Sequence, residues 1–424
     1  MLHETTIQEN RRALLATVCL SNKDIELTNN SLNELERLVD TANYETVERS
    51  IQNRKSIDKR YYLGKGFIDS LKETMIEKNI EYLIFDDEIT PSQHANIEKD
   101  FGIKVLDRTQ IIMMIFTKHA QTSEARLQIR LAELKYRLPR LKQNSADFFD
   151  RISGGSAGGV AARGAGEMQI NLDRTAIRKE IAQISDKLDK ILVQKQTQAK
   201  QREKLYRVCL VGYTNAGKST LFNQLTESKA LVEDKLFATL DSTVRPLSLS
   251  KYNNFVITDT VGFIAKLPHT LVASFRATLK EAQDADLLLH VVDASQTDFL
   301  NQMSEVNTVL NEIEADNVPV LLVFNKIDNL SPEERVILSN KHKNAVFVSA
   351  KTALNIENLV KKIEDFFVLE IDYQLLIPYK EQKLIAQLHD ISEVKELEHL
   401  ETGVRMLVKL DSNRKDLIER YIHN

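Results

Sequence analysis

The spacing of apolar residues changes several times along the chain. Between residues 1 and 115, short apolar runs such as LLATVCL and EYLIFDD alternate with stretches at helical spacing, such as GFIDSLKETMIEKN and SQHANIEKDF. Short apolar runs are typical of strands, and a repeat of 3.6 residues is typical of amphipathic helices. The alternation therefore predicts a small N-terminal α/β domain over residues 1–115.

Two long helical patterns follow, in a region that we assign to residues 116–205. The first covers residues 121–142, QTSEARLQIRLAELKYRLPRLK, and the second runs from about Arg174 to Arg207. Between them, residues 151–169 hold six of the thirteen glycines of the chain. Because ordering glycine costs backbone entropy, this glycine-rich loop indicates either a flexible linker or a backbone that approaches a partner closely.

Residues 206–370 again alternate apolar runs with helical patterns. The runs RVCLVG, NFVITDT, LLLHVVDAS and VPVLLVFNK are rich in Val, Ile, Leu and Phe, as is typical of parallel strands covered on both faces. The motif SPEE, Ser331–Glu334, is a capping box that predicts a helix start. The expected fold class is α/β with a mostly parallel, doubly wound sheet. The pattern of residues 371–424 predicts a small α/β C-terminal domain.

Composition narrows the class of protein. A chain of 424 residues is too long for one core. It has no apolar stretch of the roughly 18–20 residues that a membrane span needs, and its N-terminus lacks the core of a signal peptide. We therefore expect a cytoplasmic protein, with peripheral membrane association as the alternative. Cys19 and Cys209 lie in apolar runs, which predicts buried thiols. A net charge of −4 excludes overall basicity as a route to nucleic acid but leaves local patches open.

The strongest chemical motif is GYTNAGKST, Gly212–Thr220, which follows a predicted strand and opens a predicted helix. It matches the phosphate-binding P-loop in the context that this loop requires. Its amides and the helix N-terminus favour phosphate oxygens. We expect Lys218 to bridge the β- and γ-phosphates and the Ser219 hydroxyl to ligate Mg²⁺.

Three further motifs follow in the order of a GTP-binding domain. Asp259 ends a strand and is expected to hold Mg²⁺ through water, while Gly262 offers its amide to the γ-phosphate. In FNKID, the carboxylate of Asp328 matches the two donors of guanine, which adenine lacks. In VSAK, the Ala350 amide is expected near guanine O6. Four such motifs at strand ends predict a guanine-nucleotide site with Lys218 and Gly262 in catalysis.

The segment between the first helix and Asp259 is polar and rich in threonine, and we expect a mobile switch there. Thr239 is the expected second hydroxyl on Mg²⁺, with Thr243 as the alternative. The predicted nucleotide-binding residues are Gly212, Tyr213, Thr214, Asn215, Ala216, Gly217, Lys218, Ser219, Thr220, Phe237, Ala238, Thr239, Leu240, Asp241, Asp259, Thr260, Val261, Gly262, Asn325, Lys326, Ile327, Asp328, Ser349, Ala350 and Lys351.

Phe263 occupies the position at which well-known GTPases carry the glutamine that orients the attacking water. Three interpretations are open: a protein that binds GTP without hydrolysing it, slow hydrolysis accelerated by a partner, or a side chain supplied from elsewhere in the chain. Lys218, Mg²⁺ and the loop amides still stabilise transition-state charge. We therefore favour slow hydrolysis that a partner accelerates.

Long segments of the chain resemble the HflX family of translational GTPases. They are LGKGFIDSL, FDDEITPSQHANIEKDFGIKVLDRTQ with its continuation to Leu141, LFATLDSTVRPL, and DTVGFIAKLPHTLVASFRATLKEAQDADLLLHVVDAS. The resemblance covers essentially the full length. It implies a monomeric GTPase that binds GTP and GDP with Mg²⁺, the metal being held by Ser219 and Thr239. It also implies that Phe263 is ordinary for the family.

The resemblance further implies binding to the large ribosomal subunit, with the glycine-rich loop near the peptidyl-transferase centre of 23S rRNA. In the GTP state such a protein splits or rescues stalled or idle 70S ribosomes, particularly under stress. The loop departs from the family pattern G-G-I-G-T-R-G-P-G-E-T-Q at Ala161, Ala162, Ala165 and Met168. We expect these changes to loosen the loop and to alter its RNA contacts.

Basic side chains on the paired helices agree with RNA binding, although a solvated helix face explains many of them. A metabolic P-loop kinase is disfavoured by the guanine motif, and membrane-remodelling or tRNA-modifying GTPases lack the N-terminal block. A GTPase of large-subunit assembly, or a GTP-regulated RNA-binding factor with little turnover, is the alternative. The basic residues are Lys135, Arg137, Arg140, Lys142, Arg151, Arg163, Arg178, Lys179, Lys187, Lys190, Lys195, Lys200, Arg202, Lys204 and Arg207.

Overall fold

The computed structural model describes residues 11–21, 24–141, 159–200, 205–226, 236–237, 243–249, 252–266, 268, 271, 276–367, 370–411 and 417–422. The chain divides into two compact units. One comprises Met1–Ser248 with Tyr252–Ala353, and the other comprises Leu249–Lys251 with Leu354–Asn424. Each unit is described separately.

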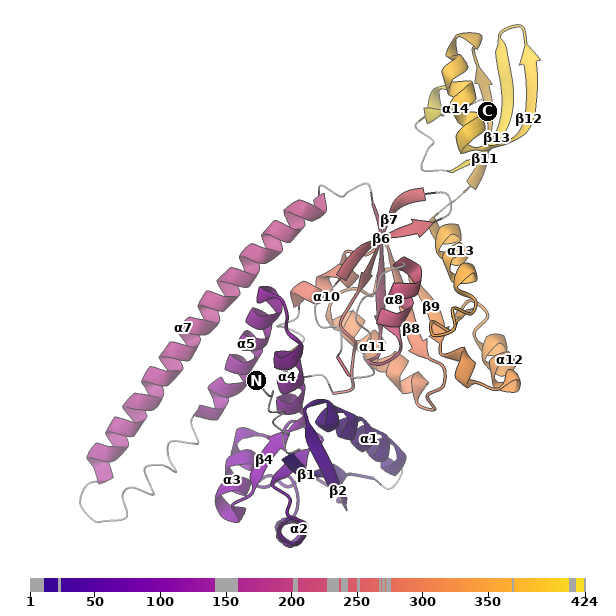
Figure 1. The fold of residues 1–424 in the computed structure, drawn as a ribbon. Coiled ribbons are helices and arrows are strands. Elements are labelled where there is room, and N and C mark those ends of the chain that lie inside the picture. The colour runs from indigo at the N-terminus through magenta and orange to yellow at the C-terminus, as the bar shows by residue number, and fades with distance from the viewer. Residues whose placement is uncertain are drawn as a thin grey trace, which may run out of the picture. The chain divides into compact units, whose positions relative to one another are not determined.

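The first unit begins with a four-stranded parallel sheet in the order β2-β1-β3-β4 (Figure 1). Leu15 on β1 packs into the cluster that includes α1 and α4, and the neighbouring Leu14 packs into the cluster of α2 and α3. This alternation is the two-residue period of a strand buried on both faces, so the predicted α/β domain is confirmed. The elements are β1 (Arg11–Cys19), α1 (Ile25–Thr41), β2 (Tyr44–Asn53), α2 (Lys65–Glu77), β3 (Tyr82–Phe85), α3 (Pro91–Phe101), β4 (Lys104–Asp107) and α4 (Arg108–His119).

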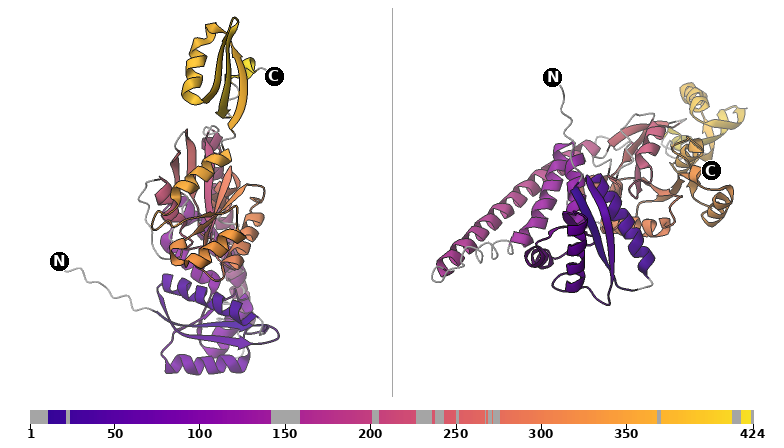
Figure 2. Two further views of the ribbon diagram at one scale, coloured as in Figure 1. Left: turned by 90° about the vertical axis from the view of Figure 1, so that its right-hand side faces the viewer. Right: turned by 60° about the horizontal axis from the view of Figure 1, so that its bottom comes forward.

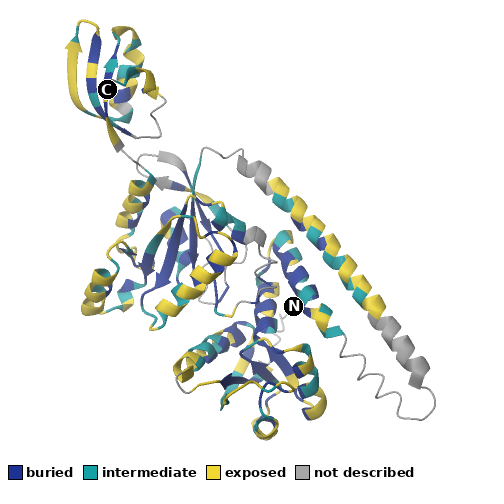
Figure 3. Cartoon of the chain, turned by 180° about the vertical axis from the view of Figure 1, so that it is seen from behind, coloured by how far each residue is buried: buried dark blue, intermediate teal, exposed yellow. Residues whose placement is uncertain are grey.

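Two helices follow as a pair. Helix α5 (Ser123–Arg137) continues into the 3-10 turn η2 (Leu138–Arg140), and α7 (Gly159–Lys200) packs along it. Leucines and isoleucines of the two helices interlock, and Arg130 forms an ion pair with Glu180 at 2.8 Å. Exposed residues line much of α7 (Figure 3), as the amphipathic pattern predicts.

The prediction of a glycine-rich loop over residues 151–169 is wrong for residues 159–169, which are helical. Residues 151–158 lie outside the described residues, but Gly159 begins α7 and the helix runs through Gln169. The segment GVAARGAGEMQ contains three alanines together with Arg, Glu, Met and Gln, which all favour helices. Their summed propensity offsets the cost of three glycines, so the helix begins about fifteen residues earlier than the predicted Arg174.

The G domain carries a six-stranded sheet in the order β10-β9-β8-β5-β7-β6, with helices on both faces (Figure 2). The four neighbouring pairs from β10 to β7 are parallel, which confirms the mostly parallel sheet. The Ser331 side chain accepts from the Glu334 amide, so the predicted capping box is confirmed. The elements are β5 (Tyr206–Gly212), α8 (Lys218–Thr226), β6 (Thr243–Leu249), β7 (Tyr252–Asp259), α10 (Arg276–Gln283), β8 (Leu287–Asp293), α11 (Phe299–Glu312), β9 (Val320–Asn325), η3 (Ile327–Asn329), α12 (Pro332–Lys341) and β10 (Val346–Phe347).

The second unit is a small α/β domain preceded by a helix. Its antiparallel sheet, in the order β11-β13-β12, packs its buried face with Leu388 of α14 and with Ile418. An α/β fold was predicted for residues 371–424, and the structure agrees. The elements are α13 (Ile356–Phe367), β11 (Glu370–Ile377), η4 (Tyr379–Glu381), α14 (Gln382–Ile391), β12 (Glu393–Leu400), β13 (Gly403–Asp411) and η6 (Glu419–Tyr421).

Two predictions from composition can be compared with the described residues. Cys19 and Cys209 are both buried and free, as expected. In the part of the chain that the structure describes, no helix combines the length and apolar character needed to cross a membrane.

Candidate nucleotide site

The predicted nucleotide motifs meet at one edge of the G-domain sheet. In the parallel register, Leu210 pairs with Asp259, Gly212 with Val291, and Asp293 with Asn325. The loops that follow β5, β7, β8 and β9 therefore leave the sheet on the same side. This is the edge at which doubly wound sheets bind ligands.

The P-loop closes tightly because of its glycines. Gly217 has φ of 90°, in the region that favours glycine, and a Cβ there would lie 2.3 Å from Nδ2 of Asn325. That Nδ2 donates to the carbonyl of Ala216 at 2.9 Å, and Oδ1 of Asn325 accepts from the Ala350 amide at 2.9 Å. Asn325 therefore joins the P-loop to the VSAK loop.

Lys218 is the first residue of α8 and is only 6% exposed. Its Nζ donates to the carbonyls of Gly212 at 3.0 Å and Tyr213 at 2.8 Å. Burial lowers the pKa of Lys218 to about 8, and the nearby Asp259 carboxylate partly opposes this. At neutral pH the side chain is mostly an ammonium, held inside the loop.

Ser219 and Asp259 form the candidate metal position. The Ser219 hydroxyl donates to Oδ2 of Asp259 at 2.7 Å, between the start of α8 and the end of β7. Among the described residues, no group of three or more His, Cys, Asp or Glu side chains could hold a metal. A pair of oxygen donors fits Mg²⁺, which in such sites is completed by phosphate oxygens and water. Thr239 lies outside the described residues, and Thr243 is half-buried in β6.

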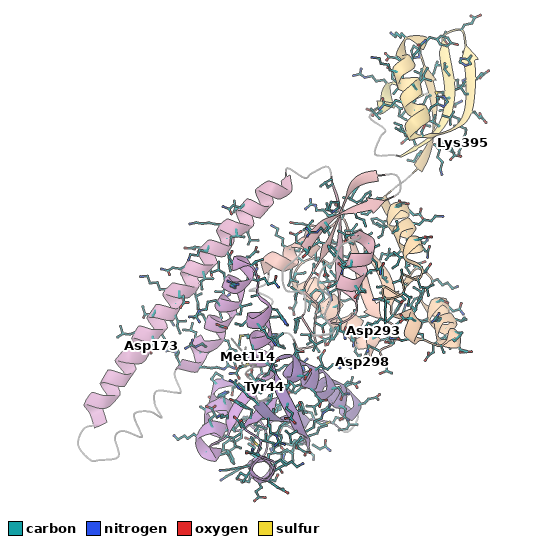
Figure 4. All side chains as sticks on the ribbon, in the orientation of Figure 1. Tyr44, Met114, Asp173, Asp293, Asp298 and Lys395 are labelled. Atoms are coloured by element: carbon teal, nitrogen blue, oxygen red, sulfur yellow. The ribbon has the colours of Figure 1, made fainter. Side chains whose placement is uncertain are left out.

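The guanine side is formed by the turn after β9. Lys326 has φ of 60°, and its Nζ lies 2.8 Å from Oδ2 of Asp293. Asp293, which Figure 4 labels, is the last residue of β8. Asp328 follows in η3, and its Oδ1 is buried without a partner among the described residues. A buried carboxylate oxygen in this position fits the two donors on the guanine edge.

The Phe263 side chain is buried in the core, with 2% exposed. Its amide donates to the Gly212 carbonyl at 3.1 Å, and its carbonyl accepts from the Thr214 amide at 2.7 Å. The backbone after β7 therefore lies against the P-loop. Gly262 permits this approach, since a Cβ there would lie 2.9 Å from Cα of Thr214.

The N-terminal domain contacts these same loops. The Tyr213 hydroxyl donates to the carboxylate of Glu34 on α1 and accepts from the Ala265 amide at 2.6 Å. Lys266 Nζ lies 2.5 Å from the carboxylate of Asp86 and 2.6 Å from that of Asp87. The contacts with Glu34, Asp86 and Asp87 join the P-loop and the segment after Gly262 to the first domain, and the bond between Ala265 and Tyr213 joins these two loops to each other.

A buried arginine forms ion pairs with two of the carboxylates in this contact. Arg108, fully buried at the start of α4, pairs with Asp86 at 2.9 Å and also with Glu34. The rings of Phe116 and Phe237 meet edge to face, with centroids 4.6 Å apart. Sequence reasoning missed the roles of Tyr213 and Lys266 in these contacts. The acidic pair that follows the strand EYLIF was the signal that could have found them.

Most of the other predicted site residues lie close to one another in the structure. The four motifs lie at the same sheet edge, in the strand ends and in the loops or first helical turns that follow them: Gly212–Thr220, Asp259–Gly262, Asn325–Asp328 and Ser349–Lys351. Phe237 is buried at the contact with Phe116. Ala238, Thr239, Leu240 and Asp241 lie outside the described residues.

Three family models match the chain. Residues 29–117 match a family described as GTP-binding GTPase N-terminal, and residues 119–202 match GTP-binding GTPase Middle Region. Residues 207–326 match a family described as 50S ribosome-binding GTPase. The matches follow one another without overlap across the first three regions of the chain.

Several curated relatives are similar over most of the chain. A GTPase HflX of Caldanaerobacter subterraneus is 37% identical, with 99% of this chain and 95% of the relative covered. GTPase HflX of Escherichia coli is 37% identical, with 88% and 86% covered, and that of Gluconacetobacter diazotrophicus is 45% identical, with 76% and 70% covered. A solved GTP-binding protein of Sulfolobus solfataricus in complex with GDP is 25% identical, covering 84% of this chain and 98% of its own, with a TM-score of 0.43.

Proposed function

Because the chain belongs to the HflX family of GTPases, we propose that it binds the large ribosomal subunit in a manner controlled by GTP. The chain itself is a GTPase. In the proposed cycle, the GTP-bound form splits or rescues stalled or idle 70S ribosomes under stress, in the cytoplasm. Hydrolysis, accelerated by the ribosome, then releases the protein.

The observation that carries this proposal is the match of residues 207–326 to a family described as 50S ribosome-binding GTPase. The contacts of Tyr213 with Glu34 and of Lys266 with Asp86 support it, since they give the nucleotide loops a direct connection to a second domain. Loops that close around a γ-phosphate can in this way alter a distant binding surface.

Within the site, we assign roles by chemistry. Lys218 bridges the β- and γ-phosphates, and the Gly262 amide meets the γ-phosphate. Ser219 and Thr239 would hold Mg²⁺, which supplies charge neutralisation at the phosphates. Asp328 selects guanine through N1–H and N2–H₂, and Asn325 fixes the loop on which the base lies.

The paired helices are the proposed RNA-binding arm, which we define as residues 116–205. Arg178, Lys179, Lys187 and Lys190 of α7 are exposed, so they are available to phosphates. Arg140 is not, because it donates to the carbonyls of Tyr136 and Ile89 and its guanidinium lies over the Tyr136 ring. Arg207 lies in β5 of the G domain. The arm is proposed to approach 23S rRNA near the peptidyl-transferase centre.

Sucrose-gradient sedimentation tests the proposal. The full chain is mixed with bacterial 70S ribosomes in the presence of GTP, GDP or a non-hydrolysable GTP analogue, with Lys218→Ala as the matched control. Conversion of 70S particles into subunits with the analogue, and not with GDP, is the expected result. Equal binding to large subunits with either nucleotide and without nucleotide would overturn the proposed switch.

The alternative, a role in large-subunit assembly, predicts a different profile. Immature large subunits would then accumulate in a deletion strain, and purified 70S ribosomes would stay intact in the assay above. Single-turnover hydrolysis with and without large subunits separates a ribosome-stimulated GTPase from an RNA-binding factor with little turnover. Equal rates in both conditions would remove the idea of activation by the ribosome.

A further inference from the structure

Thr214 is the third residue of the P-loop, and its side chain ends in a hydroxyl. The residue is 8% exposed, and its Oγ1 is buried without a hydrogen-bond partner among the described residues. Leaving a buried hydroxyl unpaired is unfavourable. Such a group is therefore expected to meet its partner in the complex with substrate.

The surroundings of Thr214 indicate which part of the substrate that is. A Cβ built on Gly262 would lie 2.8 Å from Cγ2 of Thr214 and 3.0 Å from Nζ of Lys218. The Thr214 side chain thus lies beside the two groups assigned to the γ-phosphate. Its backbone is fixed there, because its amide donates to the Phe263 carbonyl at 2.7 Å.

Thr214 also borders a cleft between the P-loop and α1. Thr214 lines this cleft of about 530 Å³, together with Asn215 of the P-loop, Lys266 after the Asp259–Gly262 motif and Glu34 of α1. Phe263 contributes nothing to this cleft, since its ring is buried in the core.

We propose that the Thr214 hydroxyl orients the attacking water in place of the glutamine that Phe263 replaces. A threonine hydroxyl can accept a hydrogen bond from water while it donates its own to a γ-phosphate oxygen. The water oxygen then forms a bond to the γ-phosphorus as the bond to the β–γ bridging oxygen breaks. GDP leaves with that oxygen, and the proton of the water ends on the released phosphate.

This inference deepens the assigned GTPase site and rests on it. It differs from a packing role, in which only the shape of Thr214 matters. Valine has nearly the same shape but no hydroxyl, and serine keeps the hydroxyl but loses the methyl group. The pair Thr214→Val and Thr214→Ser therefore separates the two roles.

The test is single-turnover hydrolysis of radiolabelled GTP by the full-length protein, with and without large subunits, alongside GTP affinity. We expect Thr214→Val to slow hydrolysis at least tenfold in both conditions at saturating GTP. GTP affinity should fall as well, because the proposed donor to the γ-phosphate is lost. Thr214→Ser should stay within threefold of the unaltered protein. A melting temperature that is unchanged or raised in Thr214→Val would agree with removal of an unpaired hydroxyl.

Two results would overturn the inference. One is hydrolysis by Thr214→Val at the unaltered rate, and the other is equal slowing in Thr214→Val and Thr214→Ser. Sedimentation of Thr214→Val with large subunits and the non-hydrolysable analogue keeps the two proposals distinguishable. Thr214→Val should still bind large subunits, so a failure of this variant to bind would count against an effect confined to hydrolysis. If the unaltered protein itself failed to bind large subunits, the proposed ribosome binding would be wrong, whatever the role of Thr214.

Discussion

At the scale of single residues, Asp328 places one buried carboxylate oxygen, without a partner among the described residues, at the turn after β9. Guanine offers that carboxylate two donors, whereas xanthine carries a carbonyl at C2 where guanine carries an amino group. Asn in place of Asp would present an amide that donates to this carbonyl.

Asp328→Asn is therefore expected to weaken GTP binding by roughly 100-fold or more and to improve binding of xanthosine triphosphate. Competition of GTP and of xanthosine triphosphate against a fluorescent guanine nucleotide measures both affinities in the variant and in the unaltered protein. Retained GTP affinity in Asp328→Asn would show that the base is recognised elsewhere.

His290 makes stability depend on pH. It lies in β8 with 3% exposed, and burial, together with the nearby Lys218 charge, lowers its pKa to about 4. The unfolded chain takes up this proton near pH 6.5 while the folded chain does not, so stability falls as pH decreases from 6.5 toward 4. The expected loss from this one group is about 2 kcal/mol between pH 7.5 and pH 5.

His290→Leu removes that group and should flatten the pH dependence by the same amount. Urea unfolding followed by a probe in the G domain, at several pH values, measures the difference between the two proteins. If the free energy of unfolding depended on pH identically in both proteins, His290 would not contribute, and the carboxylates and the other histidines would account for acid unfolding.

At the scale of elements, the segment after Gly262 is fixed by two neighbours. The Phe263 amide donates to the Gly212 carbonyl within the G domain, and the Ala265 amide donates to the Tyr213 hydroxyl, which in turn donates to Glu34 of α1. One amide thus depends on a backbone partner and the other on a side chain that reaches the N-terminal domain.

Tyr213→Phe removes the acceptor of the Ala265 amide and leaves that of Phe263. Hydrogen exchange should therefore accelerate about tenfold or more at Ala265, with little change at Phe263 as the internal control. Equal acceleration at both amides would indicate that the whole segment detaches. No change at Ala265 would contradict the bond itself.

The sequence predicted the nucleotide loops better than the contacts between domains. The motifs around Lys218, Asp259 and Asp328 are local, because each needs only a strand end and a few residues. The partners of Lys266 are about 180 residues away, and no local pattern pairs a lysine with Asp86. The start of α7 at Gly159 does not follow from the sequence pattern either, because the six glycines of residues 151–169 favour a loop while the alanines between them favour a helix.

At the scale of the whole molecule, nucleotide chemistry and the proposed RNA contact lie on separate parts of the chain. Helix α7 carries exposed Lys187 and Lys190 beside exposed Asp186 and Asp189, on a helix that contributes no residue to the nucleotide loops. The two lysines and two aspartates of residues 186–190 cancel in net charge. Binding to RNA here therefore depends on which individual side chains meet phosphates.

The double variant Lys187→Gln/Lys190→Gln tests that dependence. Each lost phosphate contact lowers the slope of log affinity against log salt by about 1, so the variant should bind large subunits more weakly, with a slope reduced by about 2. Asp186→Asn/Asp189→Asn is the matched control on the same helix turns and should bind equally well or more tightly. Intrinsic GTP hydrolysis should be unchanged in both. If the lysine and aspartate variants weakened binding alike, the effect would come from the helix itself rather than from charge, and the arm would lose its proposed contact with ribosomal RNA at these positions.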